Sequence, residues 1–156
     1  MRLLPLAVLA TSFTLSSFTL STSANGCAEN LPKSYGHVTV DQVVGVYDGD
    51  TITVTVENWP SVIGDAIGVR VAGVDTPEIR GKCASEKALA RSARELTRTA
   101  VTSASKVELY NLRRDKYFRL LADVCVDGKN LSKLLLEAGL AYAYDGGTKQ
   151  SWCGEG

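Results

Sequence analysis

The sequence predicts a mainly β domain with some α structure (α+β), built as a small five-stranded barrel with one long and one short helix. Five short segments carry β-strand patterning and are separated by turn-forming residues, and one longer stretch repeats apolar residues every three or four positions. The chain has 156 residues, so without a leader it is about one domain long. We therefore place a single domain at residues 37–156.

The first 24 residues have the pattern of a secretory signal peptide. Arg2 is followed by the apolar stretch 3–10, and small residues lead up to Ala24, where cleavage is expected. A membrane anchor is the first alternative, but Thr and Ser interrupt the apolar run and no later span of about 20 apolar residues follows. Lipid attachment at Cys27 is the second alternative. The sequence favours a secreted or periplasmic mature protein that is not attached to a membrane.

Strand and turn signals follow in order along the chain. Residues 25–36 predict an irregular arm, because they contain Asn-Gly, Leu-Pro and Tyr-Gly pairs. Valines between positions 38 and 46 predict a first strand, Asp48-Gly49 a tight turn, and the alternating residues 51–56 its partner. Residues 58–65 are expected to form an extended loop. Further strands are expected at 67–74, 106–112 and 118–126.

Helical periodicity marks two segments. Residues 84–104 predict the long helix, with an apolar face toward the core and a basic face toward solvent. The apolar face comprises Leu89, Ala93, Leu96, Ala100 and Ala104, and the basic face Lys87, Arg91, Arg94 and Arg98. The short helix is expected over 131–138, with Asn130 as its N-cap and Gly139 at its end.

Four cysteines follow the leader: Cys27, Cys83, Cys125 and Cys153. An even number in an exported chain predicts two disulfides, for which three pairings are open. We favour Cys83 with Cys153, which would tie the C-terminal tail to the segment after Glu78 and leave Cys27 with Cys125. The absence of a CxxC spacing and the presence of one histidine argue against a zinc site.

Charge is balanced overall and uneven locally. The chain has 17 basic and 17 acidic residues, and loss of the leader removes only Arg2. Residues 70–119 hold 12 basic residues against 6 acidic ones, so the rest of the mature chain is acidic. Such a local basic surface predicts binding of phosphate backbones that is weaker and more sensitive to salt than that of a uniformly basic protein.

Two aspartates suggest a site for a hard cation. Asp50 lies in an Asp-Gly-Asp hairpin turn, a signal that needs no metal by itself. Asp75, in contrast, ends an apolar strand, where an uncompensated carboxylate is costly. Ca²⁺ binds carboxylate and carbonyl oxygens, so Asp50, Asp75 and the Thr76 carbonyl predict part of its coordination shell. The alternative is a purely structural pair of carboxylates.

Three further residues suggest phosphodiester chemistry. Glu78 follows a proline that fixes the turn, and its carboxylate can accept a proton from an attacking water. Arg70 lies within an apolar strand and Arg119 near the start of another, and planar guanidiniums can each contact two phosphate oxygens. The alternatives are a surface turn for Glu78 and structural ion pairs for the arginines.

Three motifs then occur in a fixed order: DGDT at 48–51, R-x4-DTPE at 70–78, and DKYFR at 115–119. They resemble the staphylococcal nuclease-like thermonuclease family over residues 40–145. Phe118 departs from the family pattern, which usually has glycine there.

The resemblance implies a five-stranded OB-like barrel with a catalytic site at its surface. It implies Ca²⁺ ligation by Asp50, Asp75 and the Thr76 backbone, and catalysis by Arg70, Glu78 and Arg119. It also implies that four residues contact the nucleic acid: Lys116 and Tyr117 in the nucleotide site, and Tyr142 and Tyr144 stacked on bases.

The leading hypothesis is a secreted Ca²⁺-dependent endonuclease that cleaves DNA and RNA, preferring single-stranded or unwound substrates. Little sequence specificity and 3′-phosphate products follow from the resemblance. One alternative is an OB-type nucleic-acid-binding module without catalysis, and another is an exported Ca²⁺-binding protein. His37, the only histidine, has no partner motif, which argues against histidine-based hydrolysis. A monomer is expected, since no heptad pattern stands out.

Overall fold

The computed structural model describes Cys27, Leu31 and residues 33–154. The predicted signal peptide lies outside the described residues. The elements follow one another as β1 (Val38–Thr39), β2 (Gln42–Asp48), β3 (Thr51–Thr55), α1 (Ser61–Gly64), β4 (Ile67–Val71), β5 (Val74–Asp75), α2 (Ala84–Ser103), β6 (Val107–Arg114), β7 (Leu120–Val126), β8 (Lys129–Asn130), α3 (Leu131–Glu137) and β9 (Tyr142–Ala143).

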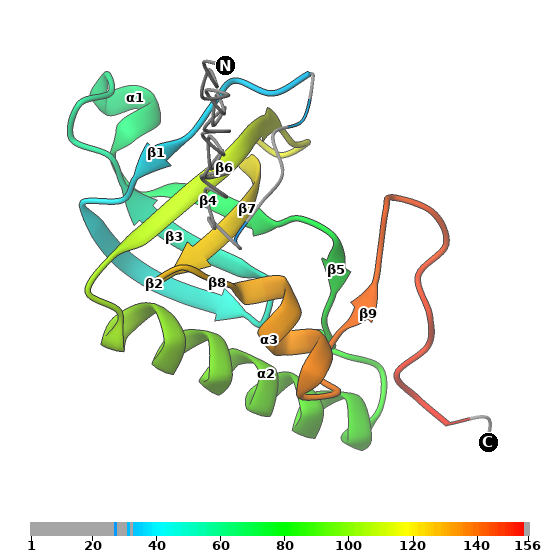
Figure 1. Ribbon diagram of the computed structural model, residues 1–156. Coiled ribbons are helices and arrows are strands. Elements are labelled where there is room, and N and C mark those ends of the chain that lie inside the picture. The colour runs from blue at the N-terminus through cyan, green and yellow to red at the C-terminus, as the bar shows by residue number, and fades with distance from the viewer. Residues whose placement is uncertain (1–26, 28–30, 32, 155–156) are drawn as a thin grey trace, which may run out of the picture.

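The main sheet is curled into a half-barrel (Figure 1). Its strand order is β1-β6-β7-β4-β3-β2, with β8 paired to the end of β7. The pairs are antiparallel except for β4 with β7, which is parallel. The five longer strands are β2, β3, β4, β6 and β7, so the predicted OB-like α+β fold is confirmed. Beside this sheet, β5 and β9 form a separate two-stranded pair.

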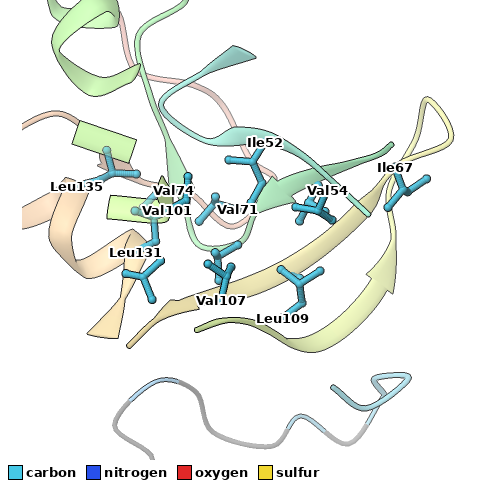
Figure 2. Close-up of a cluster of buried hydrophobic side chains, with 14 of the residues drawn as sticks. Ile52, Val54, Ile67, Val71, Val74, Val101, Val107, Leu109, Leu131 and Leu135 are labelled. Atoms are coloured by element: carbon cyan, nitrogen blue, oxygen red, sulfur yellow. The ribbon is translucent and has the colours of Figure 1, made fainter. Parts of the chain in front are cut away.

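The hydrophobic core lies inside the curl of the sheet (Figure 2). Alternation along the strands points Ile52 and Val54 of β3, and Val69 and Val71 of β4, into this core. Leu109 of β6 also points into this core and is fully buried. The opposite face of β4 is therefore left free to carry polar side chains.

The two longer helices close the core at one side (Figure 1). α3 contributes Leu131 and Leu135, and Asn130 caps it by accepting hydrogen bonds from the amides of Ser132 and Lys133, as predicted. Gly139 follows with a φ of +67°, which glycine adopts without strain. The basic face of α2 is exposed, as expected.

The buried stripe of α2 differs from the expected one. It consists of Glu86, Ala90, Ala93, Thr97 and Val101. Leu89, Leu96 and Ala100 lie at its margin, and only Ala93 belongs to both sets. The expectation followed apolar residues alone, whereas the helix turns two polar side chains inward because each has backbone partners there.

Two predicted segments are divided in the structure. The expected extended loop at 58–65 contains the one-turn helix α1, which starts after Pro60 and is closed by the bond from the Ile63 amide to the Pro60 carbonyl. The strand expected at 67–74 ends at Val71, because Gly73 turns the chain with a φ of +80°. This turn separates Arg70 on β4 from Asp75 on β5 and brings both to the same place.

The structure pairs Cys83 with Cys153 and Cys27 with Cys125, the pairing favoured by the sequence. The second disulfide uses the Cys27 thiol, which leaves no thiol there for lipid attachment. Among the described helices, none combines the length and the apolar character needed to cross a lipid bilayer.

Candidate active site

The turn between β2 and β3 carries Asp48 and Asp50 and is wedged against α2. A Cβ on Gly49 would lie 2.7 Å from Ala93 Cβ and 2.8 Å from Thr76 Cγ2, so only glycine fits this position. Thr97 Oγ1 of α2 donates a 2.6 Å hydrogen bond to the Gly49 carbonyl. The long helix thus fixes the position of the turn and of both aspartates.

Asp50 is fully buried and is held from three directions. The Thr76 amide donates to its Oδ2 at 2.9 Å, and Thr51 Oγ1 donates to its Oδ1 at 3.1 Å. Arg70 Nη1 also contacts Oδ1 at 2.5 Å. These contacts join the β2–β3 turn, β4 and the Asp75-Thr76 segment into one cluster.

Arg70 points from β4 away from the core, because the inward positions are taken by Val69 and Val71. Its Nη2 atom donates to the Val74 carbonyl at 3.2 Å and to Asp75 Oδ1 at 3.1 Å. Burial of the guanidinium disfavours its charge, but the neighbouring Asp50 and Asp75 carboxylates outweigh this effect and raise the pKa of Arg70. Arg70 therefore stays charged and bridges the two predicted metal ligands.

Arg119 reaches the same face of the sheet from the loop before β7. A Cβ on Gly68 would lie 3.2 Å from Arg119 Cβ, so the glycine two residues before Arg70 gives Arg119 room to approach. Arg119 Nε donates to Asp115 Oδ2 at 2.5 Å, and its guanidinium lies 5.6 Å from the centre of the Tyr117 ring. Lys116 lies over the same ring at 5.2 Å.

Asp48 is 3% exposed and its Oδ1 atom makes no hydrogen bond to a described residue. Burial raises the pKa of Asp48 to about 7, and the negative charges of Asp50 and Glu78 add to this effect. A buried carboxyl group with a raised pKa beside other carboxylates is a candidate member of a functional site.

Glu78 lies on a loop that is organised by a second buried carboxylate. Glu86 of α2 accepts hydrogen bonds from the Lys82 amide at 2.7 Å and from the Glu78 amide at 3.4 Å. A Cβ on Gly81 would lie 2.4 Å from Glu86 Cδ, so the loop must pass over Glu86 with a glycine. Glu86 fixes the backbone, while the Glu78 side chain remains 45% exposed and pairs with Lys149 of the C-terminal tail.

The C-terminal tail brings an additional cation to the site. Lys149 Nζ lies 2.8 Å from Asp75 Oδ1 and 3.2 Å from Glu78 Oε1. The disulfide between Cys153 and Cys83 anchors the tail four residues further on, and Trp152 stacks on Tyr142 with ring centres 4.0 Å apart. In Figure 1 the tail, drawn in red, follows β9 and leads to the C-terminus.

These elements surround a cavity of about 820 Å³. Its lining includes the polar or aromatic side chains of Asp48, Thr51, Arg70, Glu78, Asp115, Lys116, Tyr117, Arg119, Tyr144 and Lys149. The buried Asp50 and Asp75 do not line it and contact the lining through Arg70 and Lys149. Thr76 does not line it either, and its amide donates to Asp50. Tyr142 is also not part of the lining. The structure thus gathers most of the predicted site residues at one cavity and places Tyr142 against Trp152.

The donor set fits a hard divalent cation. Arg70 links Asp50 to Asp75, Lys149 links Asp75 to Glu78, and Asp48 lies near Asp50. Thr76 Oγ1 is buried and, like Asp48 Oδ1, makes no hydrogen bond to a described residue. Oxygen donors in excess over positive charge are the ligands that Ca²⁺ and Mg²⁺ require.

The fold and site define a class of small barrel proteins that can bind phosphodiesters with arginines beside a carboxylate-rich cation site. The chain belongs to the staphylococcal nuclease homologue family, whose model matches residues 68–152. This range includes Arg70, Asp75, Glu78 and Arg119.

Two proteins of Bacillus subtilis (strain 168) are similar to the chain. It is 39% identical over 118 residues to the SPbeta prophage-derived endonuclease YokF, a match that covers 72% of this chain and 36% of that protein. It is 37% identical over 123 residues to endonuclease YncB, which covers 75% of this chain and 54% of that protein. The match therefore spans about a third of one relative and about half of the other.

Three residues of the site were not singled out from the sequence. Asp48 was interpreted as part of a turn, and the Asp-Gly turn signal does not indicate that its side chain is buried. Glu86 gave a weak signal, as an acidic residue on the first turn of a helix. Lys149 gave none, because its approach to Asp75 depends on the disulfide at Cys153.

Proposed function

We propose that the chain is a secreted endonuclease that uses Ca²⁺ to hydrolyse phosphodiester bonds of DNA and RNA, with little sequence specificity and with 3′-phosphate products. The observation that carries the proposal is a cavity lined by Asp48, Arg70, Glu78 and Arg119, with Asp50 and Asp75 buried behind Arg70 and paired with it. The printed names of both relatives, which describe endonucleases, support the same reaction class.

The proposed metal ligands are Asp50, Asp75 and the Thr76 backbone, with Asp48 beside them. Bound Ca²⁺ would supply a positive charge that neutralises these buried carboxylates and favours the negative charge of an attacked phosphodiester. Calcium is preferred because the available donors are all oxygen atoms and it accepts irregular sets of carboxylates, carbonyls and water.

The chain's own residues have separate tasks. Glu78 is exposed enough to contact a water in the cavity and to accept its proton as the water attacks phosphorus. Arg119 presents a guanidinium at the cavity wall, and Arg70 holds another beside the carboxylates. Both can favour the additional negative charge on the phosphate oxygens in the transition state.

The substrate side of the cavity has aromatic and basic character. Tyr117 and Tyr144 offer rings for base stacking, and Lys116 offers a charge for the backbone. Unpaired bases can contact such rings directly, which supports single-stranded or unwound DNA and RNA as substrates. Export is supported by the predicted leader at residues 1–24 and by the two disulfides.

The proposal is tested with the oxidised protein comprising residues 25–156. Cleavage of end-labelled single-stranded DNA and RNA is followed with Ca²⁺, with Mg²⁺ and with a chelator, and phosphatase sensitivity identifies the 3′ ends. Calcium-dependent cleavage with 3′-phosphate products is the expected result. Binding of the oligonucleotide without cleavage under all three conditions would contradict the proposal and favour a non-catalytic binding module.

A further inference from the structure

An apolar groove adjoins the cavity at the loop that carries Arg119. It has a volume of about 460 Å³, within the range of small-molecule binding sites. Its principal side chains are Tyr35, Trp59, Ile63, Arg114 and Phe118, and we call it the Phe118 groove. Of the three predicted catalytic residues, Arg70 and Glu78 line only the neighbouring cavity, whereas Arg119 lines the groove as well.

The groove and the cavity share walls. Arg113, Asp115 and Arg119 line both of them, whereas Tyr117 lines only the cavity and Phe118 only the groove. The two consecutive aromatic residues therefore serve two adjoining sites, with the Arg119 side chain between them. A polymer whose phosphate contacts Arg119 can continue directly into the groove.

Exposed aromatic side chains give the groove an unusual surface. Phe118 is 64% exposed and Tyr35 is 79% exposed. Large exposed apolar groups close together indicate a surface that becomes covered by a ligand or partner.

The backbone at Phe118 supports a functional reason for its aromatic side chain. Tyr117 and Phe118 have φ values of +66° and +52°, a left-handed conformation that is unfavourable for residues other than glycine. A glycine at position 118 would adopt this conformation without strain. Strained backbone that presents an exposed ring beside a cavity is typical of binding and catalytic sites.

The groove carries a net positive charge, which favours an anionic occupant. Arg113, Arg114 and Arg119 supply three positive charges against the single carboxylate of Asp115. Arg114 is exposed and forms no ion pair with a described residue. Aromatic rings interleaved with arginines match single-stranded nucleic acid, whose bases stack on rings while its phosphates contact guanidiniums.

We propose that the Phe118 groove binds nucleotides of the substrate strand beyond the two that flank the scissile phosphate, with Phe118 and Trp59 stacking on bases and Arg114 contacting the backbone. This proposal rests on the proposed nuclease function, and it adds a second binding region that short substrates do not reach. A second copy of the chain or an apolar peptide is the competing occupant.

The test compares a short and a long substrate in Phe118→Gly. The short substrate is a thymidine dinucleotide, and the long one is a 12-residue oligo(dT). Glycine suits the left-handed backbone, so the variant is expected to fold at least as well as the wild type. Stacking of one base predicts that kcat/KM for the 12-mer falls about tenfold, while the value for the dinucleotide changes less than twofold. Val44→Ala, which changes an exposed apolar residue outside both sites, is the control.

An equal loss on both substrates would overturn the proposal, because Phe118 would then act on the catalytic loop. An unchanged kcat/KM of Phe118→Gly on both substrates would overturn the proposal as well. A change in sedimentation with unchanged kinetics would instead identify a contact between copies of the chain.

A binding measurement separates this proposal from the nuclease function itself. In Trp152→Phe, Trp59 is the remaining tryptophan and reports on the groove. The 12-mer is expected to quench the fluorescence of Trp59. When Phe118→Gly is combined with Trp152→Phe, the dissociation constant obtained from this quenching should rise about tenfold. For Arg114→Gln, the slope of the logarithm of the 12-mer binding constant against the logarithm of the salt concentration should become shallower by about one. Arg114→Lys should restore the slope. Absence of quenching would contradict the groove proposal even if the protein cleaves DNA.

Discussion

Asp48 is a buried carboxyl group whose ionisation the folded chain disfavours. Its pKa is raised to about 7 by burial and by the nearby Asp50 and Glu78. The ionised form is thus unfavourable in the folded chain without a cation. A bound divalent cation would reverse this, since it favours the charged carboxylate.

The raised pKa of Asp48 predicts how stability depends on pH when a chelator is present. The protonated form stabilises the fold fully below its ordinary pKa of 3.8, and this contribution is lost as pH rises through about 7. Asp48→Asn cannot ionise, so its melting temperature should exceed that of the wild type at pH 8 and approach it near pH 4. A gain of 1 kcal/mol corresponds to roughly 2–4 °C for a chain of this size.

Thermal unfolding in a chelator from pH 4 to pH 8 measures this difference. Asp65→Asn, at an exposed position on the loop after α1, is the matched control and should show no trend. A melting-temperature difference for Asp48→Asn that stays constant across this range would contradict the account.

Arg119 should matter for turnover and little for folding. Its side chain is at the cavity wall and its ion pair with Asp115 is partly exposed, so its loss removes few core contacts. Arg119→Ala should lower kcat by about 10²- to 10³-fold, because a transition-state contact is lost. Arg119→Lys should recover only part of the rate, since an ammonium cannot make the paired contacts of a guanidinium.

Steady-state kinetics and thermal unfolding on the same preparations check this expectation. Arg91→Ala removes an exposed arginine from the basic face of α2 and should leave kcat within about twofold. If Arg119→Ala kept wild-type turnover while folded, Arg119 would have no part in catalysis.

At the scale of elements, the sequence was most informative where local signals were strong. The strand at 51–55, the long helix and the Asn130 cap were predictable because alternation, helical periodicity and capping chemistry are local. The inward stripe of α2 was not predictable, because Glu86 is covered by the loop that precedes the helix and Thr97 donates to Gly49 on the β2–β3 turn. Burial of polar residues depends on tertiary contacts that no periodicity records.

In the candidate site, too, some features were predictable from local sequence motifs and others depend on tertiary contacts. Asp50, Arg70, Asp75 and Glu78 were predicted from motifs, and the register that places Arg70 beside Thr51 explains why they meet. The disulfide that anchors the tail was predicted. The approach of Lys149 to Asp75 and the stacking of Trp152 on Tyr142 were not, because they depend on the course of the tail between β9 and Cys153.

Lys149 on this tail should compete with the metal ion. Its ammonium contacts Asp75 and Glu78, so a cation that binds Asp75 must displace it or act against its charge. Lys149→Met keeps most of the side-chain length and removes the charge. The dissociation constant for Ca²⁺ should therefore fall about threefold to tenfold, as measured by calorimetry.

Lys133→Met, at an exposed position on α3, is the control for a general change in net charge. Weaker or unchanged Ca²⁺ binding in Lys149→Met would show that the lysine does not compete with the ion, and would contradict this interpretation of the tail.

At the scale of the whole molecule, the sheet brings opposite charges to one place. The curled sheet carries Arg70 on the face of β4 opposite the core, the β2–β3 turn adds carboxylates, and the 115–119 loop adds Arg119. Two disulfides fasten the N-terminal arm and the C-terminal tail to this framework. A near-neutral chain thereby places arginines beside a group of buried carboxylates.

The measurement that tests the central claim most directly is the rate of single-stranded DNA cleavage in Ca²⁺ by the wild type and by Glu78→Gln. Glu78 is half exposed and its backbone is held by Glu86, so this substitution removes a proton acceptor without disturbing the loop. The account predicts cleavage by the wild type that a chelator abolishes, a rate at least about 100-fold lower in Glu78→Gln, and a normal rate in the surface control Glu137→Gln. Equal rates in wild type and Glu78→Gln, or cleavage that persists in the chelator, would contradict it.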